Sequence, residues 1–141
     1  MIYHFKIHEE KGGFWAECLE IPGIVTQADS PSELLANAKE ALDVTLDEPE
    51  SSKMIFPEPH ATATSANILE VTVDPGIAFA MLVRQARVRR GMTQQQAARS
   101  MGFKGLYSYQ RLECGCRCNP ALSTIVKVHK LFPEIDLGLV C

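Results

Sequence analysis

Apolar and polar residues alternate with a period of two in several segments before residue 74, and this spacing predicts β-strands. The alternation is clearest over residues 3–8, where the odd positions are apolar, and it returns over 14–19 after the turn sequence Gly12-Gly13. These two segments are therefore expected to form a hairpin. Shorter strands are expected within 21–27 and over 68–73.

A helix with clear start signals follows the third strand. Ser30 is typical of an N-cap, Pro31 of a first helical position, and Glu33 completes an S-x-x-E capping box. The helix is expected to end near Pro49 and to lead into an irregular loop over 50–67. Its apolar positions recur at helical spacing and are expected to pack on the sheet: Leu34, Leu35, Ala38, Leu42, Thr45 and Leu46.

The apolar period changes to 3.6 after the break at Asp74-Pro75-Gly76, which predicts helices and a domain boundary. The first helix is expected over 77–90, with Gly91 at its end. Its core-facing residues would be Ala78, Met81, Leu82 and Ala86, with Val88 as a further candidate. Its arginines are expected elsewhere on the helix, either as contacts to a DNA backbone or, for most of them, as solubilising surface charges: Arg84, Arg87, Arg89 and Arg90.

Two shorter helices are expected after this one. Thr93 and Gln96 form a T-x-x-Q capping box, so the second helix would begin at Thr93 and end at Met101. Gly102 is suited to the left-handed conformation that lets the chain turn sharply into a third helix over 105–113. Two helices joined in this way indicate a helix-turn-helix.

The order of these elements predicts an α+β fold in two domains. Residues 1–74 would form a small sheet with one packed helix, and residues 75–141 an all-helical domain. The first part has four lysines, no arginine and 14 acidic residues, a formal charge of −10, whereas the second has ten basic and three acidic residues, a charge of +7. The basic part is a candidate for binding a polyanion. Alternatively, the two surfaces merely pair with each other.

The composition, 46% hydrophobic and 22% charged, is that of an ordinary globular protein. The apolar runs are too short to cross a bilayer and the first residues do not resemble a secretory signal, so we expect a cytoplasmic protein. An odd number of cysteines, five, argues against a disulfide framework. Three of them form a C-x-C-x-C string over 114–118, whereas structural zinc sites use C-x2-C pairs, so no metal and no cofactor are expected.

Several residues between 77 and 131 have the spacing of a known family. They are Gly91-x-Thr93-Gln94-x-x-Ala97-Ala98-x-x-x-Gly102, then Tyr109-x-x-Leu112-Glu113-x-Gly115-x-Arg117, and then Pro120. This pattern resembles the phage repressor and Cro superfamily of helix-turn-helix proteins. The chain departs from it in one place, because 102–113 is one residue longer than the commonest form, with Lys104-Gly105 in the turn.

The resemblance implies that the third helix enters the major groove of operator DNA. Arg111 would then read guanine, Gln110 or Ser108 would contact other base edges, and Gln94 would hold a backbone phosphate. Glu113 is expected to be structural. The full set of DNA-binding candidates is Gln94, Lys104, Tyr107, Ser108, Gln110 and Arg111. For any one of them, a solvated surface residue is the alternative interpretation.

A second set of strings lies in the acidic part. They are Gly12-Gly13-Phe14-Trp15-Ala16-Glu17, Ile21-Pro22-Gly23, Val25-Thr26-Gln27 with Asp29, and Glu33-Leu34-x-x-Asn37-Ala38-Lys39-Glu40-Ala41-Leu42. In this order they resemble the HicB antitoxin domain, a small relative of the RNase H fold. The resemblance covers about residues 1–48.

This second resemblance implies an antitoxin of a type II toxin–antitoxin system. Its acidic domain would bind and block a HicA-like mRNA-cleaving toxin, and its basic domain would repress the shared promoter. The candidates for the toxin interface are the acids on or near the hairpin: Glu9, Glu10, Glu17, Glu20 and Asp29. A homodimer or higher homo-oligomer is expected, because operators of this class present two half-sites. The apolar tail over 131–140 is a candidate for part of that interface.

Two other functions compete with this interpretation. The chain could be a stand-alone transcription regulator whose acidic domain senses a ligand or only dimerises. It could also be a nuclease, but a metal-dependent RNase H site needs a carboxylate on the first strand, and residues 3–7 contain none. His4 and His8 share the outward face of that strand without an identifiable catalytic partner. We therefore expect that the protein is not an enzyme.

Overall fold

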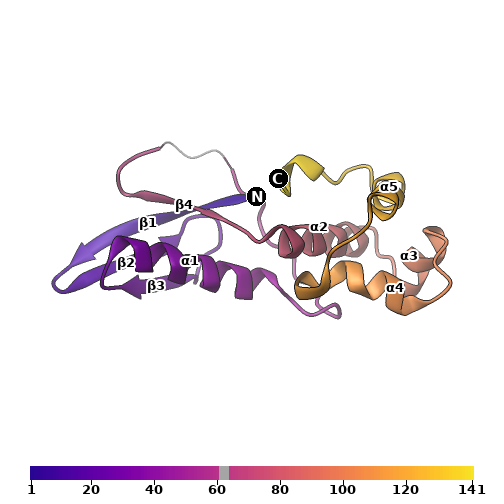
Figure 1. Cartoon of the computed structure of the whole chain (residues 1–141), viewed down its shortest axis with the longest axis horizontal. Helices are drawn as coiled ribbons and strands as arrows, with labels where there is room; N and C mark the ends of the chain where they lie inside the picture. Colours follow the sequence, from indigo (N-terminus) through magenta and orange to yellow (C-terminus); the bar gives the residue numbers. More distant parts are fainter. Residues whose placement is uncertain (61–63) are drawn as a thin grey trace. The chain divides into compact units, whose positions relative to one another are not determined.

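The computed structural model describes residues 1–60 and 64–141, and the chain separates into two compact units (Figure 1). Unit 1 comprises Met1–Leu46 and Phe56–Asp74, and unit 2 comprises Asp47–Ile55 and Pro75–Cys141. The short stretch Asp47–Ile55, which we term the crossing segment, therefore belongs to the helical unit although it lies between two parts of the other. The apolar pattern of the sequence gives no sign of this.

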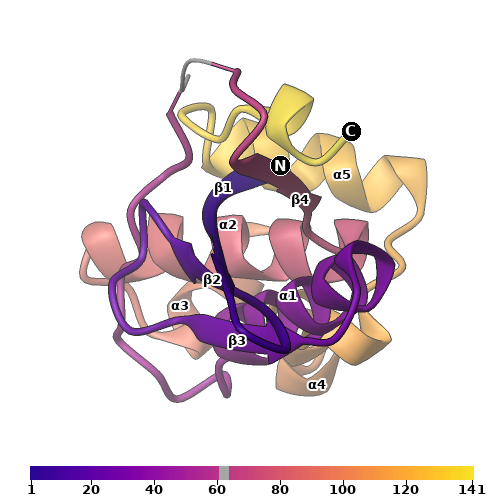
Figure 2. The same cartoon turned by 90° about the vertical axis from the view of Figure 1, so that its left-hand side faces the viewer.

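Unit 1 contains a four-stranded antiparallel sheet in the order β3-β2-β1-β4. The strands are β1 (Ile2–Glu10), β2 (Gly13–Cys18), β3 (Val25–Ala28) and β4 (Ile68–Thr72), so all four expected strands are present. The β1–β2 hairpin closes at Gly12, whose positive φ of 90° is a conformation that glycine adopts without strain. Figure 2 shows the sheet from the end at which this hairpin lies.

The helix α1 (Pro31–Leu46) covers one face of this sheet, where it contacts β2, β3 and β4. Ser30 caps it as predicted, because the Ser30 hydroxyl accepts from the Glu33 amide at 3.3 Å. The buried core joins the two elements: Tyr3, Phe5, Ala16, Leu34, Ala38, Leu42, Leu46 and Val71.

The prediction that Leu35 packs on the sheet was wrong, because this side chain is 43% exposed. Its spacing places it within the apolar stripe of α1. However, helical spacing does not show whether the sheet extends far enough to cover the first turn of the helix.

Unit 2 contains four α-helices among the described residues: α2 (Pro75–Arg89), α3 (Gln94–Ser100), α4 (Leu106–Gln110) and α5 (Leu122–Leu131). Three single turns of 3-10 helix lie over Arg111–Glu113, Gly115–Arg117 and Leu137–Leu139. The expected third helix is therefore shorter than predicted. It ends as α-helix at Gln110 and tightens into a 3-10 turn through Glu113, a common way to finish a helix.

The signals predicted around α3 are present. The Thr93 hydroxyl accepts from the Gln96 amide at 3.1 Å, and the Gln96 side chain accepts from the Thr93 amide at 2.8 Å, which completes the capping box. Gly102, with φ of 75°, adopts the left-handed conformation that ends the helix. A short turn then leads into α4.

The helix α2 is buried on all sides rather than along one stripe, from Ala78 to Arg87. The expectation that Arg84 and Arg87 are solubilising surface charges was therefore wrong, since they are 1% and 8% exposed. Arg89 and Arg90 are exposed as expected. The crossing segment accounts for part of this burial, because the Glu48 carbonyl accepts from Arg84 Nη1 at 3.0 Å.

A buried carboxylate, Glu113, connects α2, α3 and α4. Its Oε1 accepts from the Tyr109 hydroxyl and from Arg87 Nε, each at 2.6 Å. Its Oε2 accepts from Arg87 Nη2 at 2.9 Å and from Gln94 Nε2 at 3.0 Å. Burial, followed by the charge of Glu113, raises the pKa of Tyr109, so this phenol remains a donor. Burial alone would lower the pKa of Arg87, but its bonds to Glu113 raise it overall.

The structure is thus α+β, as predicted, with a four-stranded antiparallel sheet and several helices. In the part of the chain that the structure describes, the helices are all too short or too polar to span a bilayer.

We expect Glu113→Leu to lower the free energy of unfolding by about 3–5 kcal/mol, because it leaves the buried Arg87 charge without its partner. The double variant Arg87→Met, Glu113→Leu should recover most of this loss. Urea denaturation followed by helical circular dichroism measures the effect, since the single tryptophan, Trp15, lies in unit 1.

The matched control for this prediction is Glu134→Leu. Glu134 forms a bidentate pair with Arg90 at 2.7 and 2.8 Å, but on the surface, so its loss should cost about 1 kcal/mol or less. Equal effects of the two leucine variants would show that the buried network does not stabilise unit 2.

Candidate functional site

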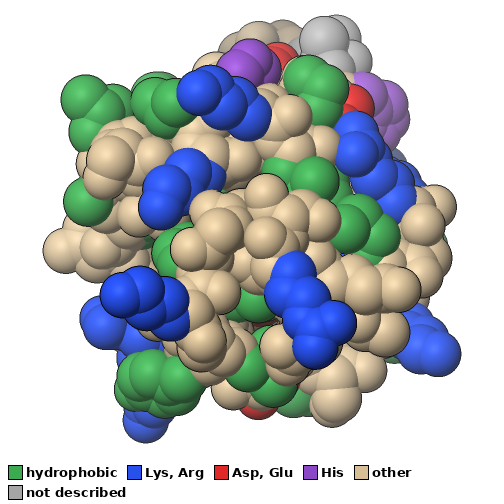
Figure 3. Space-filling view, turned by 90° about the vertical axis from the view of Figure 1, so that its right-hand side faces the viewer, with side chains coloured by type: hydrophobic (Ala, Val, Ile, Leu, Met, Phe, Trp, Pro, Cys, Tyr) green, Lys and Arg blue, Asp and Glu red, His purple; other side chains and the backbone are tan. Residues whose placement is uncertain are grey.

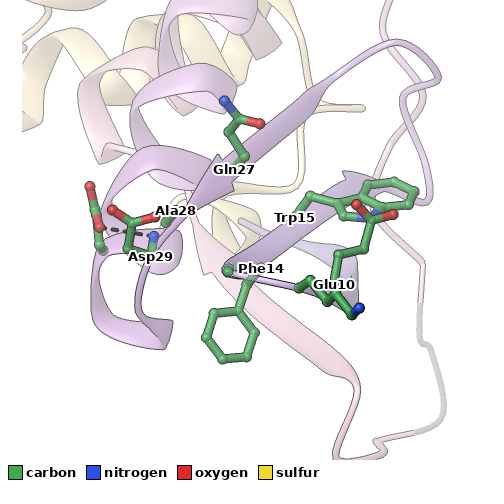
Figure 4. Close-up of a pocket in the computed structure, with 10 residues that line it drawn as sticks. Glu10, Phe14, Trp15, Gln27, Ala28 and Asp29 are labelled. Atoms are coloured by element: carbon green, nitrogen blue, oxygen red, sulfur yellow. Dashed lines mark hydrogen bonds between the residues drawn. The ribbon is translucent and has the colours of Figure 1, made fainter.

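A pocket of about 360 Å³ opens at the hairpin end of unit 1 (Figure 4). The hairpin from Glu10 to Trp15 lines one side of the pocket. The chain from Gln27 to Asp29, which leads into α1, lines the other side. Three carboxylates line it: Glu10, Asp29 and Glu33. We term this the hairpin pocket. A single cation, Lys11, accompanies these three acids, so the pocket has an excess of negative charge.

An aromatic residue forms the edge of the hairpin pocket. Trp15 stacks on His8, with ring centroids 3.9 Å apart, and its indole N–H donates to Glu10 at 3.1 Å. His8 also contacts Glu17 at 3.1 Å. Figure 4 shows Glu10 and Trp15 side by side on the hairpin, with Asp29 on the facing segment. A partly exposed tryptophan hydrogen-bonded to a carboxylate offers a partner both apolar area and negative charge.

The five acids predicted for a toxin interface are not all together. Glu10 and Asp29 line the hairpin pocket, Glu9 is exposed beside it, and Glu17 is half-buried on the sheet face that carries His8. Glu20 is different, because its side chain is fully enclosed. Glu33, which the sequence indicated only as a capping residue, joins the pocket because the turn after β3 folds back beside the hairpin.

Glu20 forms a pair with His4 that sequence reasoning missed. Its Oε1 lies 2.6 Å from His4 Nδ1, and its Oε2 accepts from the His4 amide at 3.0 Å. Glu20 is 6% exposed, so its carboxylate binds the first strand inside the protein and is not available on the surface. The expectation that it belongs to an acidic interface is therefore corrected.

A second pocket, of about 220 Å³, lies on unit 2 beside α4. Ser108 and Arg111, two of the predicted DNA-binding residues, line it together with Arg117 and Asn119. Lys104 and Tyr107 are exposed, and the Tyr107 side chain is 62% exposed. Sequence reasoning did not name Arg117 or Asn119 as site residues, because they follow α4 in an irregular segment where no helical period applies.

The two predicted glutamines contact each other. Gln110 Nε2 donates to Gln94 Oε1 at 3.3 Å, while Gln94 Nε2 donates to Glu113 and to the Glu50 carbonyl. Both ends of the Gln94 carboxamide are thus occupied within the protein. Gln94 thus joins α3 to α4 through Gln110, and the expectation that it contacts a backbone phosphate stays a prediction.

The crossing segment holds the same region from another side. Asp47 Oδ1 accepts from the Gly115 amide at 3.1 Å, and the Glu50 carbonyl accepts from Gln94 Nε2 at 3.3 Å and from Arg87 Nη2 at 3.4 Å. Gly115 is buried and packed so closely that a Cβ would lie 2.6 Å from Asp47 Oδ1 and 2.7 Å from Ile77. Glycine is required here because of this close approach.

Among residues 1–60 and 64–141, no three His, Cys, Asp or Glu side chains converge as a metal-binding group. The cysteines of the C-x-C-x-C string are all unpaired thiols, with Cys114 Sγ and Cys116 Sγ 3.4 Å apart. Cys118 instead donates to the Leu112 carbonyl at 3.4 Å.

The chain is similar to a known antitoxin at low sequence identity. The chain is 26% identical over 102 residues to the antitoxin HicB of Pseudomonas fluorescens (strain Pf0-1), an alignment that covers 62% of this chain and 70% of that protein. No family model matches the chain. The similarity suggests an antitoxin role and a toxin as the kind of partner.

We expect Gly115→Ala to destabilise unit 2 by about 1–3 kcal/mol, because the added methyl group overlaps the side chains of Asp47 and Ile77. Thermal unfolding followed by helical circular dichroism measures the change. Gly105→Ala is the control, since a Cβ at Gly105 has no neighbour within 4 Å and φ there is −137°. A melting temperature of Gly115→Ala equal to that of Gly105→Ala would contradict the close packing of this turn.

Proposed function

We propose that this protein is the antitoxin of a type II toxin–antitoxin system. In this proposal the acidic domain, residues 1–74, binds a HicA-like mRNA-cleaving toxin and blocks it. The helical domain, residues 75–141, binds operator DNA as a homodimer or higher oligomer and represses the operon. The observation that carries the proposal is the distant similarity to an antitoxin HicB, and the distribution of charge on the chain is consistent with it.

The acidic domain suits a basic, RNA-binding partner. Residues 1–74 carry a formal charge of −10, and unit 1 alone, without the crossing segment, carries −8, so it would attract such a partner over a distance comparable to the Debye length. The hairpin pocket offers a specific contact within that field, because Glu10, Asp29 and Glu33 line the same pocket as Trp15, with Glu10 hydrogen-bonded to the indole. Contacts of this kind usually combine an aromatic anchor with charged groups at its rim.

The helical domain suits DNA. The helices α3 and α4 are joined by a short turn at Gly102, and we interpret them as a helix-turn-helix whose second helix enters the major groove. The end of unit 2 that carries them displays mainly Lys and Arg among its charged side chains (Figure 3). Arg111 and Ser108 would reach base edges, and Arg117, beside them, would contact the phosphate backbone.

The proposed toxin contact is tested with the product of the small open reading frame next to this gene. Glu10→Lys and Asp29→Lys, each made alone in the full chain, should weaken the complex on the order of tenfold at low ionic strength, mainly through slower association. Surface plasmon resonance measures the rates, and rescue of growth during toxin expression measures neutralisation.

Glu40→Lys is the matched control, because it makes the same charge change at an exposed position of α1 outside the hairpin pocket. If all three variants behave alike, the toxin binds elsewhere on the acidic domain. If the unaltered chain neither binds nor neutralises the neighbouring product, the antitoxin function itself is wrong, and a stand-alone regulator becomes the better interpretation.

The proposed DNA contact is tested with the DNA upstream of the gene. Arg111→Ala should cost about 1–3 kcal/mol of binding free energy and relax the preference for one base pair. Arg117→Ala should weaken binding to all sequences and reduce the slope of log K against log salt by about 1. Fluorescence anisotropy at several salt concentrations distinguishes the two effects.

Lys11→Ala is the control here, since it removes one positive charge from unit 1. It should leave both the affinity and the salt slope close to those of the unaltered protein. A loss of affinity in Lys11→Ala as large as in Arg111→Ala would mean that DNA is bound by general charge rather than by α4.

A further inference from the structure

Two thiols lie in contact on the segment that follows α4. Cys114 Sγ and Cys116 Sγ are 3.4 Å apart, Cys116 is exposed, and Cys114 is partly exposed. The two residues flank Gly115, so they belong to the turn that the crossing segment holds through Asp47. The proposed antitoxin function makes no use of this pair.

The third cysteine of the string is in a different environment. Cys118 is half-buried, donates to the Leu112 carbonyl at 3.4 Å, and burial raises its pKa to about 12. A thiol that keeps its proton is a poor nucleophile. Cys114 and Cys116 are therefore the reactive pair, and Cys118 is set apart from them by its own hydrogen bond.

We propose that Cys114 and Cys116 form a reversible disulfide by exchange with a low-molecular-weight disulfide such as oxidised glutathione. The exposed Cys116 thiolate attacks one sulfur of that molecule, which forms a mixed disulfide and releases one thiolate. Cys114 then loses its proton and attacks Cys116 Sγ, which releases the second thiolate. In total, two protein thiols are oxidised and one small disulfide is reduced to two thiols, which take up the two protons.

The order of the two attacks follows from the contact between the sulfurs. Cys116 is the more exposed of the two thiols, and the hydrogen bond to Cys116, followed by burial, raises the pKa of Cys114, so Cys116 reacts first. Once Cys116 carries the mixed disulfide, that hydrogen bond is lost and Cys114 is free to react. The sulfurs must approach from 3.4 Å to about 2 Å, a movement that side-chain rotation on the exposed side can supply.

Oxidation should also disturb the turn between the two cysteines. The buried Gly115 is packed closely against Asp47 and Ile77. Closure of the small disulfide ring that includes Gly115 should therefore break the hydrogen bond from the Gly115 amide to Asp47. A strained, exposed disulfide is easily reduced, which suits a reversible modification rather than a structural bridge.

The sequence permits a direct test on the full chain. Trypsin cleaves after Arg111 and Arg117, so Cys114 and Cys116 remain together in the peptide over 112–117 while Cys118 falls in the next peptide. The reduced protein is equilibrated with glutathione buffers of increasing oxidised fraction, quenched with acid, alkylated and analysed by mass spectrometry. We expect this peptide to lose two hydrogen atoms as the buffer becomes oxidising and to regain them with dithiothreitol.

Variants separate this product from its competitors. Cys118→Ser and the remote Cys141→Ser should form the same bridge, whereas Cys114→Ser should stop at a glutathione adduct on Cys116. The proposal is overturned if the peptide keeps two alkylated thiols throughout, if the unaltered protein stops at the adduct, or if Cys116 is linked to Cys118. Circular dichroism confirms that each variant is folded.

Hydrogen exchange tests the effect on the turn. Amide exchange over residues 112–117 should become faster in the oxidised protein, because the Gly115 amide loses its acceptor, and it should not change when Cys116→Ser is treated in the same way. Equal exchange in the oxidised and reduced proteins would overturn the link between the disulfide and Asp47. None of these measurements depends on a toxin or an operator, so their failure is distinguishable from failure of the proposed function.

Discussion

The buried carboxylate of Glu113 is the interaction on which unit 2 depends. A charge in an apolar core is costly unless every lone pair is satisfied, and here Arg87, Tyr109 and Gln94 supply the donors. Because each donor comes from a different part of the unit, one residue fixes α2, α3 and the end of α4 together. The surface that we propose for DNA binding is therefore supported by this buried network.

The crossing segment extends this constraint to the chain that connects the two units. Its backbone carbonyls at Glu48 and Glu50 accept from Arg84, Arg87 and Gln94, and Asp47 holds the turn at Gly115. The crossing segment, which follows α1 in the sequence, thus stabilises the helical unit. Any change in the turn around Gly115, including the proposed disulfide, would act on the same group of contacts.

Periodicity identified most of the secondary structure and some of the candidate site. The strands, α1, the Thr93 capping box and the left-handed Gly102 could be predicted because their signals lie within each segment, although β1 and β4 pair across distant parts of the chain. Arg84 and Arg87 could not, because their burial depends on residues more than 25 positions away, such as Glu48 and Glu113. Glu20 was misplaced for a related reason, since its carboxylate is paired inside the protein with His4, 16 positions away.

The sequence by itself determined the α+β class, the change of period near Pro75, the separation of charge and the motifs that resemble an antitoxin. These features are encoded in spacing and residue type, which can be interpreted without knowledge of the tertiary structure. Only the tertiary structure decided which charges are buried, that Glu10, Asp29 and Glu33 share one pocket, and that Cys114 and Cys116 touch. Such facts depend on distances between side chains, and these are set by how the elements pack rather than by the pattern that forms them.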